Sequence, residues 1–230
     1  MCCRRQSDRR FHTPNLFCGT RTNRSVRCFR LLALVAACAP LASAQWVNLV
    51  QGPSLDGWEV VGDGSWTVMK DGTLVGQRNP KQAKGQSWLY TKKEYGEFDL
   101  HVEYWNRYTG NSGVSIRDVS RAKEWDIPTG SRPSRVGYEI QIQFYDDHNP
   151  TGSLYNVAPA KNPKENQFDW NTLDIESRND VIRVKLNGEL VTESPGDPKR
   201  SKTGPIGLQL HDQNALVMFR NIRIQEVAKK

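Results

Sequence analysis

Three short stretches of the chain alternate apolar side chains with polar side chains that can bind a ligand or move a proton. They are residues 113–117, 138–144 and 206–211. Successive side chains of a strand point to opposite faces of its sheet, so one face of each stretch is apolar. The opposite face carries Ser115, Arg117, Glu139, Gln141, Gln143, Gln209 and His211. Such alternation is also typical of a sheet with one solvated face, but amides, an arginine and a histidine on three strands favour a binding surface.

The elements that must position these side chains are strands. Short alternating runs recur along residues 45–230, and no window keeps apolar residues at helical spacing. Asp71-Gly72 and Asn187-Gly188 each separate two such runs and predict two-residue hairpins. About a dozen strands in one domain of this size predict an all-β fold, a two-sheet antiparallel sandwich, because a single sheet would leave one face bare.

The positive charge of the chain lies in its first 44 residues. This leader holds eight arginines and one acid, whereas residues 45–230 hold 24 basic and 24 acidic side chains. Residues 45–230 are therefore neutral overall, and the basic pI of the whole chain does not predict that they bind nucleic acid. All five cysteines also lie in the leader, which excludes disulfides and thiol chemistry from the body: Cys2, Cys3, Cys18, Cys28 and Cys38.

The end of the leader has the pattern of a secretory signal peptide. An apolar core at 31–37 follows Arg27 and Arg30, and small residues precede Gln45. The core is too short for a membrane span. We expect cleavage after Ala44 and export to the periplasm or the medium, with lipidation at Cys38 as the alternative. We also expect that translation starts nearer Val26 than Met1.

Ordered motifs over residues 46–227 identify a family resemblance. They are Leu55-Asp56-Gly57-Trp58, Gly96-Glu97-Phe98-Asp99-Leu100, residues 110–117, Tyr138-Glu139-Ile140-Gln141-Ile142, Thr151-Gly152-Ser153-Leu154-Tyr155, Trp170-Asn171-Thr172, Asn187-Gly188, residues 204–211 and Phe219-Arg220-Asn221-Ile222. The chain resembles the bacterial 3-keto-disaccharide hydrolase family, which implies a jelly-roll sandwich of the concanavalin A or laminarinase type. It departs from the family pattern at Trp105, Ser153 and Asp212.

The resemblance implies action on glycosides whose C3 hydroxyl a separate sugar 3-dehydrogenase has oxidised to a ketone. The ketone acidifies the C2–H, so a base removes that proton and the glycosidic oxygen leaves C1 by elimination. Water then adds to the enone, which gives net hydrolysis. The site must supply a base, an acid and donors for the enolate.

Three side chains are candidates for this chemistry. His211 is the first candidate for base or acid, because imidazole titrates near neutral pH, and a hydrogen bond within the sheet face is its alternative role. Glu139 is the second candidate, or only an acceptor for sugar hydroxyls. Arg117 would polarise the ketone, or form an ion pair with Glu139. The candidates for binding sugar hydroxyls are Asn111, Gln141, Gln143, Gln209 and Tyr155.

The row Glu139, Gln141, Gln143 has one carboxylate, which argues against a laminarinase mechanism with a close carboxylate pair. Asp146, Asp147 and His148 have metal-ligand side chains, but hard cations need more oxygen ligands. We therefore expect no certain cofactor, with a divalent metal as the alternative. A lectin-like carbohydrate-binding module is the competing function, with Trp105, Trp125 and Trp170 as its stacking platforms.

Overall fold

The computed structural model describes residues 45–107, 109–122 and 136–227, and these residues contain strands and loops but no α-helix. Eight strands form one antiparallel sheet, in which β1 (Val47–Asn48) pairs with β13. The others follow the order β11 (Glu189–Pro195), β10 (Val181–Leu186), β9 (Asn171–Arg178), β6 (Phe98–Asn106), β13 (Leu216–Glu226), β4 (Leu74–Gln77) and β3 (Ser65–Val68).

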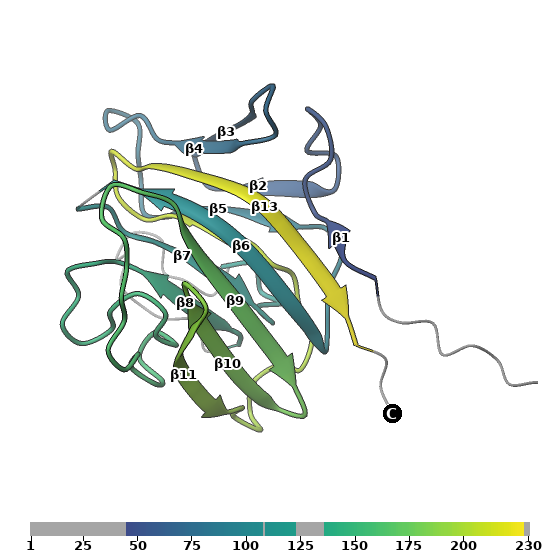
Figure 1. Cartoon of the computed structure of the whole chain (residues 1–230). Coiled ribbons are helices and arrows are strands. Elements are labelled where there is room, and N and C mark those ends of the chain that lie inside the picture. Colours follow the sequence, from purple (N-terminus) through teal and green to yellow (C-terminus); the bar gives the residue numbers. More distant parts are fainter. Residues whose placement is uncertain (1–44, 108, 123–135, 228–230) are drawn as a thin grey trace, which may run out of the picture. The chain divides into compact units, whose positions relative to one another are not determined.

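Five strands form the second antiparallel sheet, which lies behind the first in Figure 1. Their order is β2 (Trp58–Val61), β5 (Ser87–Thr91), β12 (Gly207–Leu210), β7 (Ser112–Ile116) and β8 (Tyr138–Ile142). Several neighbours in both sheets, such as β6 and β13 or β5 and β12, are far apart in sequence, as in a jelly roll. The predicted all-β, two-sheet antiparallel sandwich is confirmed.

The core lies between the two sheets and is built from the apolar face of each alternating strand. The eight-stranded sheet contributes Phe98, Leu100 and Val102 from β6, and the five-stranded sheet contributes Ile140 and Leu208. All are at most 1 % exposed. Burial of this apolar area is the main term that stabilises the sandwich, at about 25 cal/mol per Å².

The two predicted hairpins differ in their loops. Leu186 pairs with Glu189, and both Asn187 and Gly188 have positive φ, so this two-residue loop is confirmed. The Asp71-Gly72 loop is longer than predicted, because Met69 N donates to Thr73 O (2.7 Å) and leaves three residues in the loop. Asp71 Oδ1 accepts from Thr73 N (3.0 Å), which stabilises the longer turn.

Candidate functional site

The polar face of the five-stranded sheet is buried, although a sheet face of this kind is more often solvated. All residues of β5, β7, β8 and β12 are buried on both faces. Glu139 is 6 % exposed, Gln141 2 % and Gln209 0 %. Burial of carboxyl and amide groups costs free energy unless they find partners. The polar side chains of this face are therefore shielded from solvent, unlike those of a solvated sheet face, and they make it the candidate site.

Strand register places one row of side chains across this face, with Glu139 within it. Ser115 pairs with Glu139 on one side and with Gly207 on the other, and Gly207 pairs with Tyr90. Beyond β8, Tyr155 N donates to Glu139 O (2.9 Å), while the neighbouring Leu154 lies in the core. Alternation then directs Tyr155 to the polar face, so the predicted binding residue lies beside Glu139.

Two glycines make room for the side chains of this face. A Cβ at Gly113 would lie 2.6 Å from Glu139 Oε1, so the Glu139 side chain extends over β7 towards β12. A Cβ at Gly207 would lie 2.3 Å from the Tyr90 ring. Both strands use glycine because a neighbouring side chain occupies the Cβ position.

Glu139 is the most perturbed acid of the face. Burial raises its pKa to about 8, the negative charge of Asp118 adds to this rise, and a hydrogen bond with the Gln209 side chain opposes it. At neutral pH the carboxyl is therefore mostly protonated, and it can donate a proton. Burial also raises the pKa of Tyr155, and the nearby Glu139 charge contributes.

Asp118 is a second carboxyl at this face, but its oxygens are occupied. They accept hydrogen bonds from Ser120 Oγ (2.6 Å), Ser120 N (3.1 Å), Ala122 N (3.2 Å) and the Tyr90 hydroxyl (3.2 Å). Burial, and then the Asp118 charge, raise the pKa of Tyr90 well above its usual value. Asp118 thus anchors the chain after β7 and tunes its neighbours, and it lacks the free oxygen that a nucleophile needs.

Amide groups beside Glu139 have hydrogen-bonding capacity left. Gln209 Nε2 donates to Gln86 Oε1 (3.2 Å), and Gln141 Nε2 donates to Gln143 Oε1 (3.0 Å). Among the described residues, the buried atoms Gln209 Oε1 and Asn111 Oδ1 accept no hydrogen bond. Buried acceptors are rarely left unpaired, so these two atoms are suited to hydroxyl groups of a ligand.

His211 directly follows β12, two residues beyond Gln209. In an extended chain, two residues span about 7 Å and return the side chain to the same face. The His211 side chain is 35 % exposed, and its Nδ1 lies 3.1 Å from Asp212 Oδ1. Strand register therefore places His211 next to Asn111, and it places the Glu139 row two same-face positions further along the sheet, with Gln209 between them.

Arg117 is held away from Glu139. It follows β7 with a φ of 58°, which ends the alternation that the sequence pattern predicted. Its guanidinium is buried and lies 3.2 Å from Asp180 Oδ1, in the β9–β10 turn of the other sheet. The ion pair with Glu139, the alternative role for Arg117, is not among the described contacts, and Arg117 instead joins the two sheets.

The metal candidates do not converge. Asp146 Oδ1 accepts from His148 N (2.9 Å) and Asn149 N (2.8 Å), as in a loop turn, while Asp147 and His148 are exposed. No group of three or more His, Cys, Asp or Glu side chains that could hold a metal occurs within the part of the chain that the structure describes.

Sequence reasoning missed three residues of the site. Trp88 and Tyr90 stack with ring centroids 5.5 Å apart on the polar face, and Asp118 lies beside Tyr90. The alternation of Trp88, Leu89 and Tyr90 was a usable signal, because it places two aromatic rings on the face opposite Leu89. No local sequence pattern predicts where Asp118 lies, because its position depends on the direction that the chain takes after Arg117.

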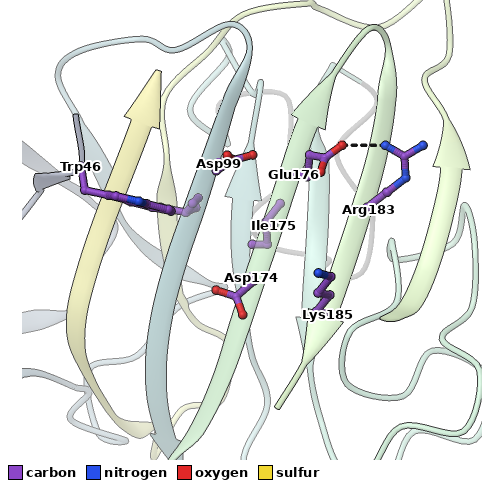
Figure 2. A pocket seen from close by; sticks show the side chains of 8 residues that line it. Trp46, Asp99, Asp174, Ile175, Glu176, Arg183 and Lys185 are labelled. Atoms are coloured by element: carbon purple, nitrogen blue, oxygen red, sulfur yellow. Dashed lines mark hydrogen bonds and ion pairs between the residues drawn. The ribbon is translucent and has the colours of Figure 1, made fainter. Parts of the chain in front are cut away.

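The outer face of the eight-stranded sheet has a different character. A pocket of about 220 Å³ lies there, and Figure 2 shows Trp46 at one side and charged side chains at the other. Its carboxylates have partners on neighbouring strands: Glu176 forms an ion pair with Arg183 (2.6 Å), and Asp174 Oδ1 lies 2.6 Å from His101 Nδ1. This pattern is typical of a solvated sheet face with cross-strand pairs.

Two of the expected stacking platforms lie away from the candidate site. Trp105 alternates along β6 with core residues of the eight-stranded sheet, so its side chain belongs to the outer face of that sheet. The Arg220 guanidinium lies over the Trp170 ring, with Cζ 4.0 Å from the ring centroid. Trp125 lies outside the described residues. Trp88 is therefore the tryptophan of the described chain that the structure places on the polar face.

The two antiparallel sheets and their strand order define the fold class, a jelly-roll sandwich of the concanavalin A type. Residues 45–225 match the family described as the 3-keto-alpha-glucoside-1,2-lyase-like domain, and the chain belongs to that family. A search among curated proteins gave no match. Within the described residues, no helix has the length and apolar character needed to cross a membrane.

Solved structures share the fold at low identity. A provisionally named glycosyl hydrolase from Parabacteroides distasonis ATCC 8503 has a TM-score of 0.61 and 24 % identity, over 80 % of this chain and 100 % of that chain. A carbohydrate-binding module from Bacillus subtilis has a TM-score of 0.52 and 16 % identity, over 74 % and 96 %. A beta-glucanase from Bacillus licheniformis has a TM-score of 0.51 and 12 % identity, over 82 % and 100 %.

Proposed function

We propose that this protein cleaves 3-keto-glycosides and 3-keto-disaccharides by C2 proton abstraction and elimination, followed by hydration. The observation that carries the proposal is Glu139, a buried carboxyl with a pKa of about 8 on a face with two unpaired amide acceptors. A carboxyl that keeps its proton at neutral pH is suited to protonate a leaving oxygen. The family name refers to a 1,2-lyase, which agrees with the elimination step.

The proposed elimination uses two proton transfers, and the hydration that follows reverses both. His211 removes the proton from C2, and the electron pair of that bond forms an enolate with the C3 ketone. The enolate collapses, a double bond forms between C1 and C2, and the bond from C1 to the glycosidic oxygen breaks. Glu139 gives its proton to that oxygen. A proton of water passes to Glu139 as the water oxygen bonds to C1, and His211 returns its proton to C2. Both residues regain their starting states, and the net reaction is hydrolysis.

The other polar groups hold the sugar in this proposal. Asn111 and Gln209 accept hydrogen bonds from sugar hydroxyls, and Gln141, Gln143 and Tyr155 complete the binding set. Tyr90 lies in the same row as Glu139, but its hydroxyl donates its proton to Asp118 (3.2 Å), so in this proposal Tyr90 supports the polar face and does not donate to the enolate oxygen. For Arg117 we propose a structural role, because its described ion pair joins the two sheets.

The proposal extends to the supply of substrate and to location. A sugar 3-dehydrogenase must act first, since unoxidised glycosides lack an acidic C2–H. We propose that the protein is exported to the periplasm or the medium, with a lipid anchor at Cys38 as the alternative. Mass spectrometry of the mature N-terminus distinguishes Gln45 from a lipidated Cys38, and retention of the leader would contradict both.

The test is turnover of 3-keto-trehalose and of a 3-keto-β-glucoside in D₂O, beside the unoxidised parent sugars. We expect cleavage of the keto sugars alone, with deuterium at C2 of the product, and the same rates with EDTA. Glu139→Gln should lower kcat by about 10²- to 10⁴-fold. Glu165→Gln is the control, because Glu165 is a half-buried carboxyl with a raised pKa whose oxygens accept hydrogen bonds from Tyr104 and Thr151.

The competing function is carbohydrate binding without catalysis. The carbohydrate-binding module from Bacillus subtilis that shares the fold favours it, whereas Trp88 and Tyr90 are at most 1 % exposed and offer no platform for a sugar ring. Saturable NMR line broadening of a sugar, with no cleavage of either keto substrate, would replace the enzymatic proposal by the binding one.

A further inference from the structure

A histidine–carboxylate pair lies at the end of β12, where the polar face meets solvent. His211 Nδ1 is 3.1 Å from Asp212 Oδ1. The other carboxylate oxygen, Asp212 Oδ2, accepts a hydrogen bond from Asn111 N (2.8 Å), just before β7. Burial opposes ionisation of Asp212, but the hydrogen bonds from His211 and Asn111 hold its pKa below the usual value. Asp212 is thus an anionic acceptor fixed on two sides.

The backbone that carries this pair is fixed by a buried arginine. Arg78 Nη1 donates to His211 O (3.1 Å), to Asp212 O (3.3 Å) and to Gly85 O (2.7 Å). Asp63 holds the same guanidinium, with Oδ1 2.7 Å from Nε and Oδ2 3.0 Å from Nη2. Arg78 is 6 % exposed, so water competes little for these bonds. The two residues after β12 therefore have little freedom to move.

This geometry determines which ring nitrogen of His211 carries the proton. A carboxylate only accepts hydrogen bonds, so the neutral imidazole places its proton on Nδ1 and donates it to Asp212. Nε2 then carries the lone pair, and it has no hydrogen-bond partner among the described residues. An imidazole oriented through Nδ1 in this way is ready to accept a proton at Nε2.

We infer that Asp212 is a positioning residue, which fixes the tautomer and ring orientation of His211 so that Nε2 serves as the base. The inference rests on the proposed function for the identity of the reaction, but the tautomer itself is a property of the protein without substrate. Asp212 acts through His211 and does not touch the sugar.

The test is Asp212→Asn in the full chain, with ¹⁵N NMR of His211 and steady-state kinetics on 3-keto-trehalose. The amide is the same size as the carboxylate, and its oxygen can still accept from Asn111 N. Its NH₂ group donates to Nδ1, so the ring proton moves to Nε2. We expect the ¹⁵N shifts to exchange between Nδ1 and Nε2, and kcat to fall about 10- to 100-fold with little change in KM.

The matched control is Asp174→Asn. Asp174 Oδ1 lies 2.6 Å from His101 Nδ1, so the chain has a second histidine–carboxylate pair, on the outer face of the other sheet. This variant should change the His101 signals and leave kcat unchanged. An equal loss of kcat in both variants would contradict a specific role of Asp212.

The remaining outcomes separate this inference from the proposed function. An unchanged His211 tautomer in Asp212→Asn overturns the inference, and so does a changed tautomer with unchanged kcat. If the wild-type protein cleaves no keto sugar, the proposed function fails. The ¹⁵N measurement then still decides whether Asp212 orients His211. Thermal unfolding of each variant shows whether any loss reflects the fold.

Discussion

At the residue scale, the polar face of the five-stranded sheet contains one carboxyl, Glu139, whose protonation differs between the folded and unfolded states. Burial raises the pKa of Glu139 to about 8 from an ordinary value of 4.5. The folded protein therefore binds this proton over a pH range in which the unfolded chain has released it. The contribution of Glu139 to the free energy of unfolding is therefore fully present below about pH 4.5, and it is lost as the pH rises towards 8.

We accordingly predict that Glu139→Gln removes part of the pH dependence of the free energy of unfolding. The slope due to Glu139 is at most about 1.4 kcal/mol per pH unit between pH 5 and 8. The variant should gain stability relative to the wild type as the pH rises over this range. Urea unfolding of both proteins at pH 5 and pH 8 measures it, because all other groups titrate alike. A constant difference between them would contradict the raised pKa.

At the element scale, strand pairing brings side chains from several strands together where glycine leaves space. Gly113 on β7 is the clearest case, since a Cβ there would lie 2.6 Å from Glu139 Oε1 and 3.0 Å from Glu139 Cγ. The Glu139 carboxyl reaches Gln209 on β12 only because β7 has no side chain at this position.

Gly113→Ala should therefore displace the Glu139 carboxyl and lower kcat on 3-keto substrates by at least about 10-fold. An error of 1 Å in the position of a reacting group is sufficient for such a loss. Gly57→Ala is the matched control, because a Cβ at Gly57 meets no atom within 4 Å. Steady-state kinetics and circular dichroism of both variants provide the measurement. Unchanged kcat in a folded Gly113→Ala protein would argue against a catalytic role for Glu139.

At the scale of the whole domain, the two sheets are joined by the apolar core and by polar contacts at their edges. The buried Arg117 guanidinium of the five-stranded sheet pairs with Asp180 in the eight-stranded sheet, and Lys202 Nζ also lies 2.7 Å from Asp180 Oδ2. Hydrogen bonds from Lys202 and then Arg117 lower the pKa of Asp180, although burial opposes this.

We predict that Asp180→Asn leaves the Arg117 charge buried without its counter-ion and destabilises the fold by about 1–3 kcal/mol. This lies below the usual cost of breaking a buried pair, because Asp180 is 41 % exposed. The loss should be largest at neutral pH and shrink as the pH falls below the usual pKa of Asp180. Thermal unfolding at pH 7 and pH 3 checks this. A loss that is the same at both values would indicate a steric cause instead.

The sequence alone was sufficient for the features that depend on local pattern. Alternation at 138–142 and 207–210 predicts which side chains share a face, since a strand repeats every two residues. Asn187-Gly188 predicts its turn, because both positions need positive φ. Ordered motifs were also sufficient to recognise the family.

Only the tertiary structure decided the features that depend on distant neighbours. The pKa of Glu139 rises because burial removes water from its carboxyl and the Asp118 charge lies nearby, and no local pattern predicts burial. Arg117 leaves the polar face because one left-handed residue ends the alternation after β7. Asp212 acquires its partners from residues 101 and 134 positions earlier in the chain. Local pattern determines which face a side chain occupies, whereas the packing of non-local segments determines its charge, partners and reach.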